Sequence, residues 1–212
     1  MEAIILSAGF GRRLRPITKN IPKPLLKYKE KTLLTHNILT LFYYGFNKFF
    51  INAYYLSEKM RNFIKGIYGV EITFYEEPEI AGTGGGVYNF RDFIEGDYFL
   101  IQNADIYHDI DISKALNFHI KNRAFLTLIL KNDFDNKVVL DNYRVIDFLN
   151  KHTSGAFTFV GITIASKKFF YYLEKKCSLV EGFKRAILNG ERVLGYITKE
   201  KFEDAINIFK IF

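Results

Sequence analysis

The chain has 212 residues, of which 49% are hydrophobic and 25% charged, a composition typical of a globular protein that excludes an intrinsically disordered one. The single cysteine, Cys177, excludes an internal disulfide and a cysteine-based zinc site, and it fits a reducing cytoplasm. The net charge of +7 is concentrated in residues 1–31, and such a compact basic cluster suits a polyphosphate better than a nucleic acid, whose binders more often carry a basic stripe.

In the first half, apolar runs alternate with helical patterns. Residues 3–7 form an apolar, β-branched run without a preceding basic segment, so they predict a buried strand and no signal peptide. The next segment, 9–24, is rich in glycine and proline and is expected to be a loop. The elements expected after it are helices at 32–44, 57–67 and 85–93 and strands at 48–52, 70–75 and 98–102.

This order predicts an α/β, Rossmann-like fold with a mostly parallel central sheet and helices on both faces. No apolar stretch is long enough to cross a bilayer, so no membrane association is expected. Ligands of such sheets bind at the carboxyl ends of the strands. The three most unusual segments each begin where a strand is expected to end, at 9, at 76 and at 103, so we expect them to converge on one site.

The second half is less regular. We expect a hairpin around Asp141 and Asn142, and we expect the whole chain, 1–212, to form a single domain with a small β lobe. The other expected elements are helices at 111–122, 166–175 and 199–209, strands at 125–130 and 156–165, and further elements at 180–188 and 192–197.

The loop after the first strand reads Leu6-Ser-Ala-Gly-Phe-Gly-Arg-Arg-Leu-Arg-Pro. Glycines at this place let backbone N–H groups approach phosphate oxygens, and the guanidinium groups that follow match phosphate geometry. The Walker pattern is absent, and the dinucleotide fingerprint fails because Leu14 stands where a third glycine is required. An ordinary turn with solvated arginines is the alternative interpretation.

Lys23 lies between Pro22 and Pro24, which restrict the backbone on both sides. A lysine held in this way can stabilise charge on a transferring phosphoryl group, although a surface lysine in a proline turn is the alternative.

The segment 82–86 reads Gly-Thr-Gly-Gly-Gly, a poor start for the expected helix. We therefore expect the glycines to admit a flat ligand or a phosphate close to the backbone, and a flexible loop is the alternative.

Asp105 follows the strand at 98–102, where its carboxylate could hold Mg²⁺. Asp109 and Asp111 fit better as caps of the next helix. His108 and His119 lack ligand-like partners in the sequence and are expected to be structural or exposed.

Together these segments resemble the sugar-1-phosphate nucleotidyltransferases, in particular the short muramate and mannose 1-phosphate members. Residues 6–26 are similar to the signature of that family, an apolar strand followed by Ala-Gly-x-Gly-x-Arg-Leu-x-Pro and Pro-Lys-Pro-Leu. Gly82-Thr-Gly-Gly-Gly resembles its base-binding loop, Asn103-Ala-Asp105 its metal-binding strand, and Phe157-Thr-Phe-Val-Gly161 its sugar-contacting strand.

The resemblance implies an enzyme that transfers a nucleotidyl group from an NTP to a sugar 1-phosphate, releasing pyrophosphate, with Mg²⁺ as cofactor. Residues 1–120 would bind the nucleotide and 121–212 the acceptor, and a homo-oligomer is compatible with the family. By analogy Arg13 and Lys23 are catalytic, Asp105 binds the metal, and Lys151 and Gly161 contact the acceptor. The implied nucleotide-binding residues are Leu6, Ala8, Gly9, Gly11, Arg13, Glu77, Gly82, Thr83, Gly84, Gly85 and Asn103.

The sequence departs from the family in two places. Asn150-Lys151-His152 stands where the family has Glu-Lys-Pro, so only the lysine matches. The family also has a late Trp-x-Asp-Ile-Gly-Thr-Pro-Glu segment, whose aspartate completes the metal site, and this aspartate is missing from the comparable residues 193–202, either replaced or removed with a short deletion. Two alternatives follow: a carboxylate from elsewhere in the chain substitutes for it, or one ligand together with phosphates and waters holds the ion. A catalytically impaired nucleotide-sugar-binding regulatory subunit is therefore one alternative, and a cytidylyltransferase acting on a non-sugar phosphate such as phosphocholine is another.

Glu77 stands where many members place a base-reading glutamine. A carboxylate accepts hydrogen bonds, so it would favour a base that presents N–H donors, such as guanine.

Overall fold

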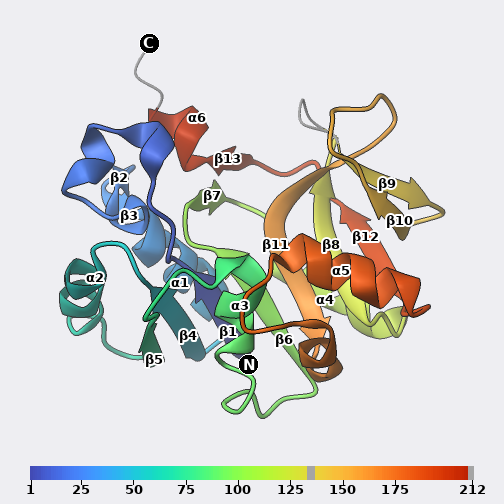
Figure 1. The fold of residues 1–212 in the computed structure, drawn as a ribbon, viewed down its shortest axis with the longest axis horizontal. Helices are drawn as coiled ribbons and strands as arrows, with labels where there is room; N and C mark the ends of the chain where they lie inside the picture. Colours follow the sequence, from blue (N-terminus) through green and yellow to red (C-terminus); the bar gives the residue numbers. More distant parts are fainter. Residues whose placement is uncertain (133–136, 210–212) are drawn as a thin grey trace.

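A nine-stranded sheet forms the centre of the computed structural model, which describes residues 1–132 and 137–209 (Figure 1). Only β10 and β11 run against the remaining strands of this sheet, so the predicted mostly parallel sheet is confirmed. In spatial order the strands are β5 (Glu71–Glu76), β4 (Lys48–Ala53), β1 (Glu2–Leu6), β6 (Tyr98–Asn103), β11 (Thr158–Ser166), β8 (Leu126–Lys131), β12 (Val193–Ile197), β10 (Arg144–Phe148) and β9 (Val138–Asp141).

The register of the three parallel strands β4, β1 and β6 aligns their carboxyl ends at one edge of the sheet. Leu6 at the end of β1 pairs with Asn52 on β4 and with Asn103 on β6. The loops that leave these strands therefore start side by side, which is the arrangement that places ligands at the carboxyl ends of parallel strands.

Helices cover both faces of the sheet, as predicted (Figure 1). One face packs against α1 (Leu33–Tyr43), α2 (Ser57–Ile64) and α4 (Ile112–Lys121), which bury Leu41, Met60 and Ala115 in one hydrophobic cluster. The other face packs against α3 (Gly82–Tyr88), α5 (Leu179–Leu188) and the 3-10 helix Lys167–Tyr172, which bury Val87, Phe183 and Phe169 in a second cluster.

The predicted hairpin around Asp141 and Asn142 is present as β9 and β10. Arg144 pairs with Leu194 on β12, so the hairpin extends the central sheet at its edge.

Two small antiparallel sheets lie apart from the central one, β2 (Lys27–Tyr28) with β3 (Lys31–Thr32), and β7 (Ile106–His108) with β13 (Phe202–Asp204). The predicted helix over 199–209 is wrong in its first part, since only Ala205–Phe209 is helical (α6). Pairing with β7 overrides the helical pattern there, and the residues of α6 pack instead on a third cluster that contains Leu14 and Leu26.

The polar residues around β7 and α4 differ in part from expectation. Asp111 caps α4 by accepting a hydrogen bond from the Ser113 amide at 3.0 Å, as predicted, but Asp109 does not cap it. His108 and His119 are both buried, and burial lowers the pKa of His119 to about 4. Among the helices of the described residues, none combines the length and apolarity that a membrane span requires.

Candidate active site

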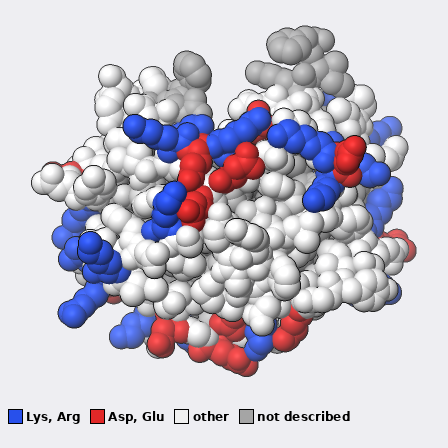
Figure 2. Space-filling view, turned by 180° about the vertical axis from the view of Figure 1, so that it is seen from behind, with Lys and Arg blue, Asp and Glu red and all other residues white. Residues whose placement is uncertain are grey.

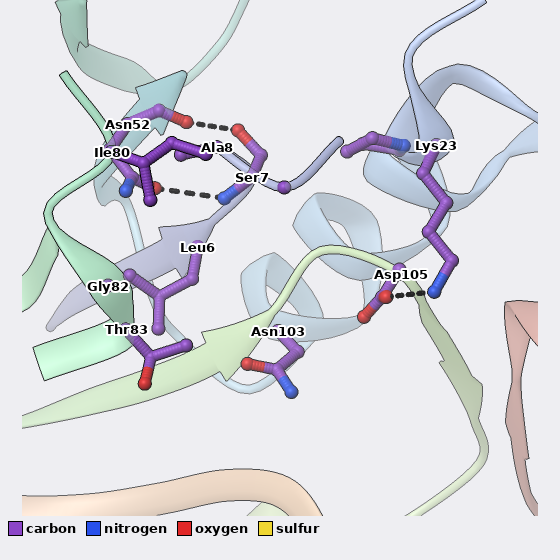
Figure 3. A pocket seen from close by; sticks show the side chains of 12 residues that line it. Leu6, Ser7, Ala8, Lys23, Asn52, Ile80, Gly82, Thr83, Asn103 and Asp105 are labelled. Atoms are coloured by element: carbon purple, nitrogen blue, oxygen red, sulfur yellow. Dashed lines mark hydrogen bonds and ion pairs between the residues drawn. The ribbon is translucent and has the colours of Figure 1, made fainter. Parts of the chain in front are cut away.

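A cavity of about 300 Å³ opens at the carboxyl ends of β1, β4 and β6 (Figure 3). A hollow of about 270 Å³ adjoins it and shares Gly9, Lys23 and Asp105. The cavity is lined by Leu6, Ser7, Ala8, Gly9, Lys23, Pro24, Asn52, Ile80, Gly82, Thr83, Asn103 and Asp105, and the hollow by Gly9, Phe10, Gly11, Arg12, Arg13, Lys23 and Asp105. The structure thus brings together most of the residues that the sequence singled out.

The loop after β1 is shaped by local packing. Gly11 has a φ of +63°, and a Cβ at this position would lie 3.0 Å from the Thr18 side chain. The Thr18 hydroxyl donates a hydrogen bond to the Gly11 carbonyl at 2.7 Å, which closes the turn. Arg12 and Arg13 are exposed beside the hollow, so their guanidinium groups are accessible to an anion there.

Lys23 lies in a short 3-10 helix, Lys23–Leu25, and its side chain is only 10% exposed. Its ammonium group forms an ion pair with the Asp105 carboxylate, and the two side chains point toward one another on the same side of the cavity (Figure 3). The Asp204 carboxylate lies 3.9 Å from the same ammonium group. Two carboxylates from distant parts of the chain therefore converge on one cation.

Asp204 lies beside Lys23, although the sequence interpretation did not single out this residue. Asp204 ends β13, where it pairs with Ile106, and the Ala205 amide donates to the Asp105 carbonyl at 2.9 Å. The signal was present as Phe202-Glu-Asp204, an aromatic residue two positions before an aspartate, as in the Trp-x-Asp of the family. Residues 193–202 contain only the first residue of this pattern, so a match confined to them does not include the aspartate.

The donor set around Lys23 fits a hard divalent cation. Asp105 and Asp204 offer carboxylate oxygens, the ligand type that Mg²⁺ prefers, and the ammonium group between them shows that the pair attracts positive charge. Within residues 1–132 and 137–209 no group of three or more His, Cys, Asp or Glu side chains forms a complete cage. Such a site suits Mg²⁺, which commonly takes one or two carboxylates together with phosphate oxygens and water.

Two glycines of α3, Gly84 and Gly85, contact another segment of the chain rather than the cavity. A Cβ at Gly84 would lie 2.6 Å from the Cys177 Sγ, and one at Gly85 would lie 2.5 Å from the Lys175 carbonyl. The amides of both glycines donate to the Cys177 carbonyl, at 2.9 and 3.1 Å. These two residues therefore admit another chain segment rather than a ligand, because their N–H groups are already used, whereas Gly82 and Thr83 line the cavity.

Glu77 is also placed differently from expectation. It is 3% exposed and lies behind the cavity lining, where its two carboxylate oxygens accept hydrogen bonds from the Asn52 side chain at 2.7 Å and from the Ala81 amide at 3.1 Å. Burial raises the pKa of this carboxyl, and the two hydrogen bonds oppose that effect. In this arrangement Glu77 does not present its carboxylate to a base in the cavity.

The two residues predicted to contact the acceptor have different positions. Lys151 is exposed in the loop before β11 and lines neither the cavity nor the hollow. Gly161, with a φ of +83°, lies on β11 directly against Asn103, since a Cβ there would be 2.6 Å from the Asn103 amide nitrogen. Gly161 thus makes room for a side chain that lines the cavity, but Lys151 does not reach it.

The cavity combines two kinds of wall. Leu6, Ile80 and Gly82 give one side an apolar and backbone surface, while Lys23 and Asp105 lie on the other (Figure 3). A ligand with a flat ring and a charged phosphate chain matches this division.

Comparisons with known proteins agree with this geometry. Residues 2–152 match the family model described as nucleotidyl transferase. The chain is 31% identical to D-glycero-alpha-D-manno-heptose 1-phosphate guanylyltransferase of Aneurinibacillus thermoaerophilus, with 96% of this chain and 92% of that protein covered. It is 34% identical to mannose-1-phosphate guanylyltransferase 1 of Arabidopsis thaliana, over 56% of this chain and 35% of that protein. The chain spans less than half the length of most of the curated relatives it matches.

Solved structures share the fold. HddC from Yersinia pseudotuberculosis complexed with GMP-PN has a TM-score of 0.83 at 24% identity, with 96% of this chain and 93% of that chain covered. The inositol-1-phosphate CTP transferase from T. maritima has a TM-score of 0.85 at 18% identity, with 96% and 88% covered. The family match over residues 2–152 and the 31% identity to a relative of nearly the same length establish that this chain belongs to the nucleotidyl transferase family.

Proposed function

We propose that this protein transfers a nucleotidyl group from an NTP to a sugar 1-phosphate, forming an NDP-sugar and pyrophosphate. The observation that carries the proposal is the convergence of Lys23, Asp105 and Asp204 beside the loop that follows β1. Enzymes that transfer phosphoryl groups use a loop that binds phosphates, a lysine that neutralises phosphate charge and carboxylates that hold a metal ion.

In the proposed reaction the acceptor phosphate attacks the α-phosphorus of the NTP in line, the bond to the β-phosphate oxygen breaks, and pyrophosphate leaves. The protein would contribute position and charge rather than a covalent intermediate. Arg13 and the glycine amides of the loop would hold the triphosphate, and Lys23 would neutralise the charge that develops on the transferred group. Gly82 and Thr83 would lie against the base.

The cofactor we propose is Mg²⁺, held by Asp105 and Asp204. When bound, it would neutralise phosphate charge and help to orient the reacting oxygens. The chain itself would keep the two carboxylates together through the β7–β13 pairing, because Asp204 and Ile106 are partners in that ladder.

GTP and a mannose- or heptose-like sugar 1-phosphate are the substrates we put first. They are supported by the names of two relatives, a heptose 1-phosphate guanylyltransferase and a mannose-1-phosphate guanylyltransferase, although a third is a UTP--glucose-1-phosphate uridylyltransferase of Synechocystis. We place the regulatory-subunit alternative lower, because the Asp204 carboxylate lies 3.9 Å from the Lys23 ammonium and offers a second carboxylate at the site.

Small molecules, rather than nucleic acids, are the partners we propose. On the face seen in Figure 2, basic side chains form a band across the upper part of the molecule, with acidic side chains set between them. Ion pairs such as Lys201–Glu203 and Lys114–Asp111 neutralise part of the surface charge. A band of mixed sign differs from the bare basic stripe of nucleic-acid binders.

The test is a pyrophosphate-release panel in which four NTPs are crossed with mannose, heptose, glucose and N-acetylated amino sugar 1-phosphates and with phosphocholine, in the presence of Mg²⁺. We expect release only when an NTP and a sugar 1-phosphate are both present, and most rapidly with GTP. Two results would contradict the proposal. One is pyrophosphate release with phosphocholine but with none of the sugar 1-phosphates, and the other is the absence of release with every acceptor of the panel.

A further inference from the structure

Two separate chain segments form the walls of the nucleotide cavity. Ser7, Ala8 and Gly9 come from the loop after β1, whereas Ile80, Gly82 and Thr83 come from the loop before and the first turn of α3. These two segments are not neighbours in a common β-ladder, and backbone hydrogen bonds tie the α3 side to Cys177 rather than to the loop after β1.

A buried chain of hydrogen bonds joins the two walls. The Ser7 amide donates to the Asn52 Oδ1 at 2.9 Å, the Asn52 Nδ2 donates to the Glu77 Oε1 at 2.7 Å, and the Ala81 amide donates to the Glu77 Oε2 at 3.1 Å. The Ser7 hydroxyl makes a further contact with the Asn52 carbonyl. Asn52 is 2% and Glu77 3% exposed, so water does not compete for these groups.

We infer that Glu77 is a positioning residue that sets the spacing between the two walls of the nucleotide cavity, and that it does not read the base. This inference rests on the proposed function, because it concerns the binding of an NTP at the same site.

The directions of these hydrogen bonds require a carboxylate at position 77 when position 52 is asparagine. Both neighbours of Glu77, the Asn52 amide and the Ala81 N–H, are donors, and only a group with two acceptor oxygens satisfies both. The surroundings are built to this pair, since a Cβ at Gly86 would lie 2.5 Å from the Asn52 Nδ2 and 3.2 Å from the Glu77 Oε1.

The direction of these hydrogen bonds gives a sharp test. In Glu77→Gln the new NH₂ group must face either the Asn52 Nδ2 or the Ala81 amide, and both of these are hydrogen-bond donors. A flip of the Asn52 side chain would turn its oxygen toward this NH₂ group, but it would then place the Asn52 NH₂ group against the Ser7 amide, which is also a donor. Adding Asn52→Asp removes the conflict. The carboxylate introduced at position 52 accepts both from the Ser7 amide and from the new NH₂ group at position 77, and the oxygen of that side-chain amide accepts from Ala81. The double variant has the same net charge as the native protein.

The experiment measures the melting temperature without ligand and the dissociation constant of each of the four NTPs, with no acceptor present, for the native protein, Glu77→Gln, and the Asn52→Asp/Glu77→Gln double variant. Loss of one buried hydrogen bond should lower the melting temperature of Glu77→Gln and raise the dissociation constants of all four NTPs by a common factor of about ten. The double variant should recover both quantities, with affinities within about threefold of the native ones.

Two outcomes would overturn the inference. One is a change confined to the preferred NTP that the double variant does not reverse, which is the result expected if Glu77 reads the base. The other is an unchanged melting temperature together with unchanged affinities in Glu77→Gln. Failure of the proposed function is distinguishable, since it appears as NTP binding by the native protein without pyrophosphate release for any acceptor.

Discussion

Replacing Asp204 with asparagine removes one charge from the cluster and preserves the size of the side chain. The Asp204 carboxylate lies 3.9 Å from the Lys23 ammonium, a distance at which two unit charges interact by about 4 kcal/mol at an effective dielectric constant of 20. Because the Asp204 side chain is 35% exposed, solvent screening reduces its contribution to folding stability to about 1 kcal/mol or less.

The expected effect on catalysis is much larger than that on stability. In the proposed function Asp204 helps to hold the Mg²⁺ that would neutralise phosphate charge, so its replacement weakens that stabilisation indirectly. Loss of one electrostatic contribution to the transition state typically reduces turnover by about 10²–10³-fold, which corresponds to about 3–4 kcal/mol. Asp204→Asn should therefore lower the rate of pyrophosphate release by about that factor, while its melting temperature falls by no more than about 4 °C.

Glu203→Gln is the matched control for this experiment. Glu203 is the preceding residue of β13, and its carboxylate accepts a hydrogen bond from the Tyr28 hydroxyl at 3.0 Å, outside the residues that line the cavity. This variant loses the same charge from the same strand and should retain most of the activity. More than a tenth of native turnover in Asp204→Asn, or an equal loss in Glu203→Gln, would refute the assignment of Asp204 to the site.

Three further predictions address other parts of the site and the core. Lys23→Ala should reduce pyrophosphate release by at least about 100-fold without unfolding the protein, as monitored by circular dichroism; near-native turnover would contradict its role. Gly84→Ala should lower the melting temperature by several degrees because its Cβ would lie 2.6 Å from the Cys177 Sγ, whereas Gly9→Ala, with no atom within 4 Å, should leave it unchanged and raise the KM for the NTP. Burial lowers the pKa of His119 to about 4, below its usual 6.5, so His119 contributes stability above pH 6.5 that is lost as the pH falls toward 4. Urea unfolding of His119→Gln between pH 7 and 4 should show a shallower loss, and an unchanged slope would contradict this account.

Local pattern was sufficient to predict the central sheet and the place of the cavity. The apolar runs that became β1, β4 and β6 alternate with helices, and this order implies parallel strands whose loops converge at one edge. Lys23 was predicted from its two flanking prolines, which act on the backbone locally.

The remaining features depend on contacts between distant segments. Asp204 was assigned to a helix because β13 forms only by pairing with β7, and a three-residue strand leaves little trace in the sequence. Glycines in a row indicate a close approach, but the sequence does not tell whether a ligand or another segment approaches, and at Gly84 and Gly85 it is the segment 175–178. Lys151 was transferred by resemblance alone, and its exposed loop places it outside the cavity.

The division of the site between distant segments has a consequence for fragments of this protein. The portion that matches the family model, residues 2–152, contains Lys23 and Asp105, but it contains neither Asp204 nor the Cys177 carbonyl that holds α3. It also lacks β11, whose ladder with β6 runs from Ile162 to Ser166 and joins the later strands to the earlier ones. A polypeptide released from the ribosome with this portion alone would have the loop after β1 but only one of the two carboxylates, so under the proposed function the site is completed only when the last part of the chain has been made.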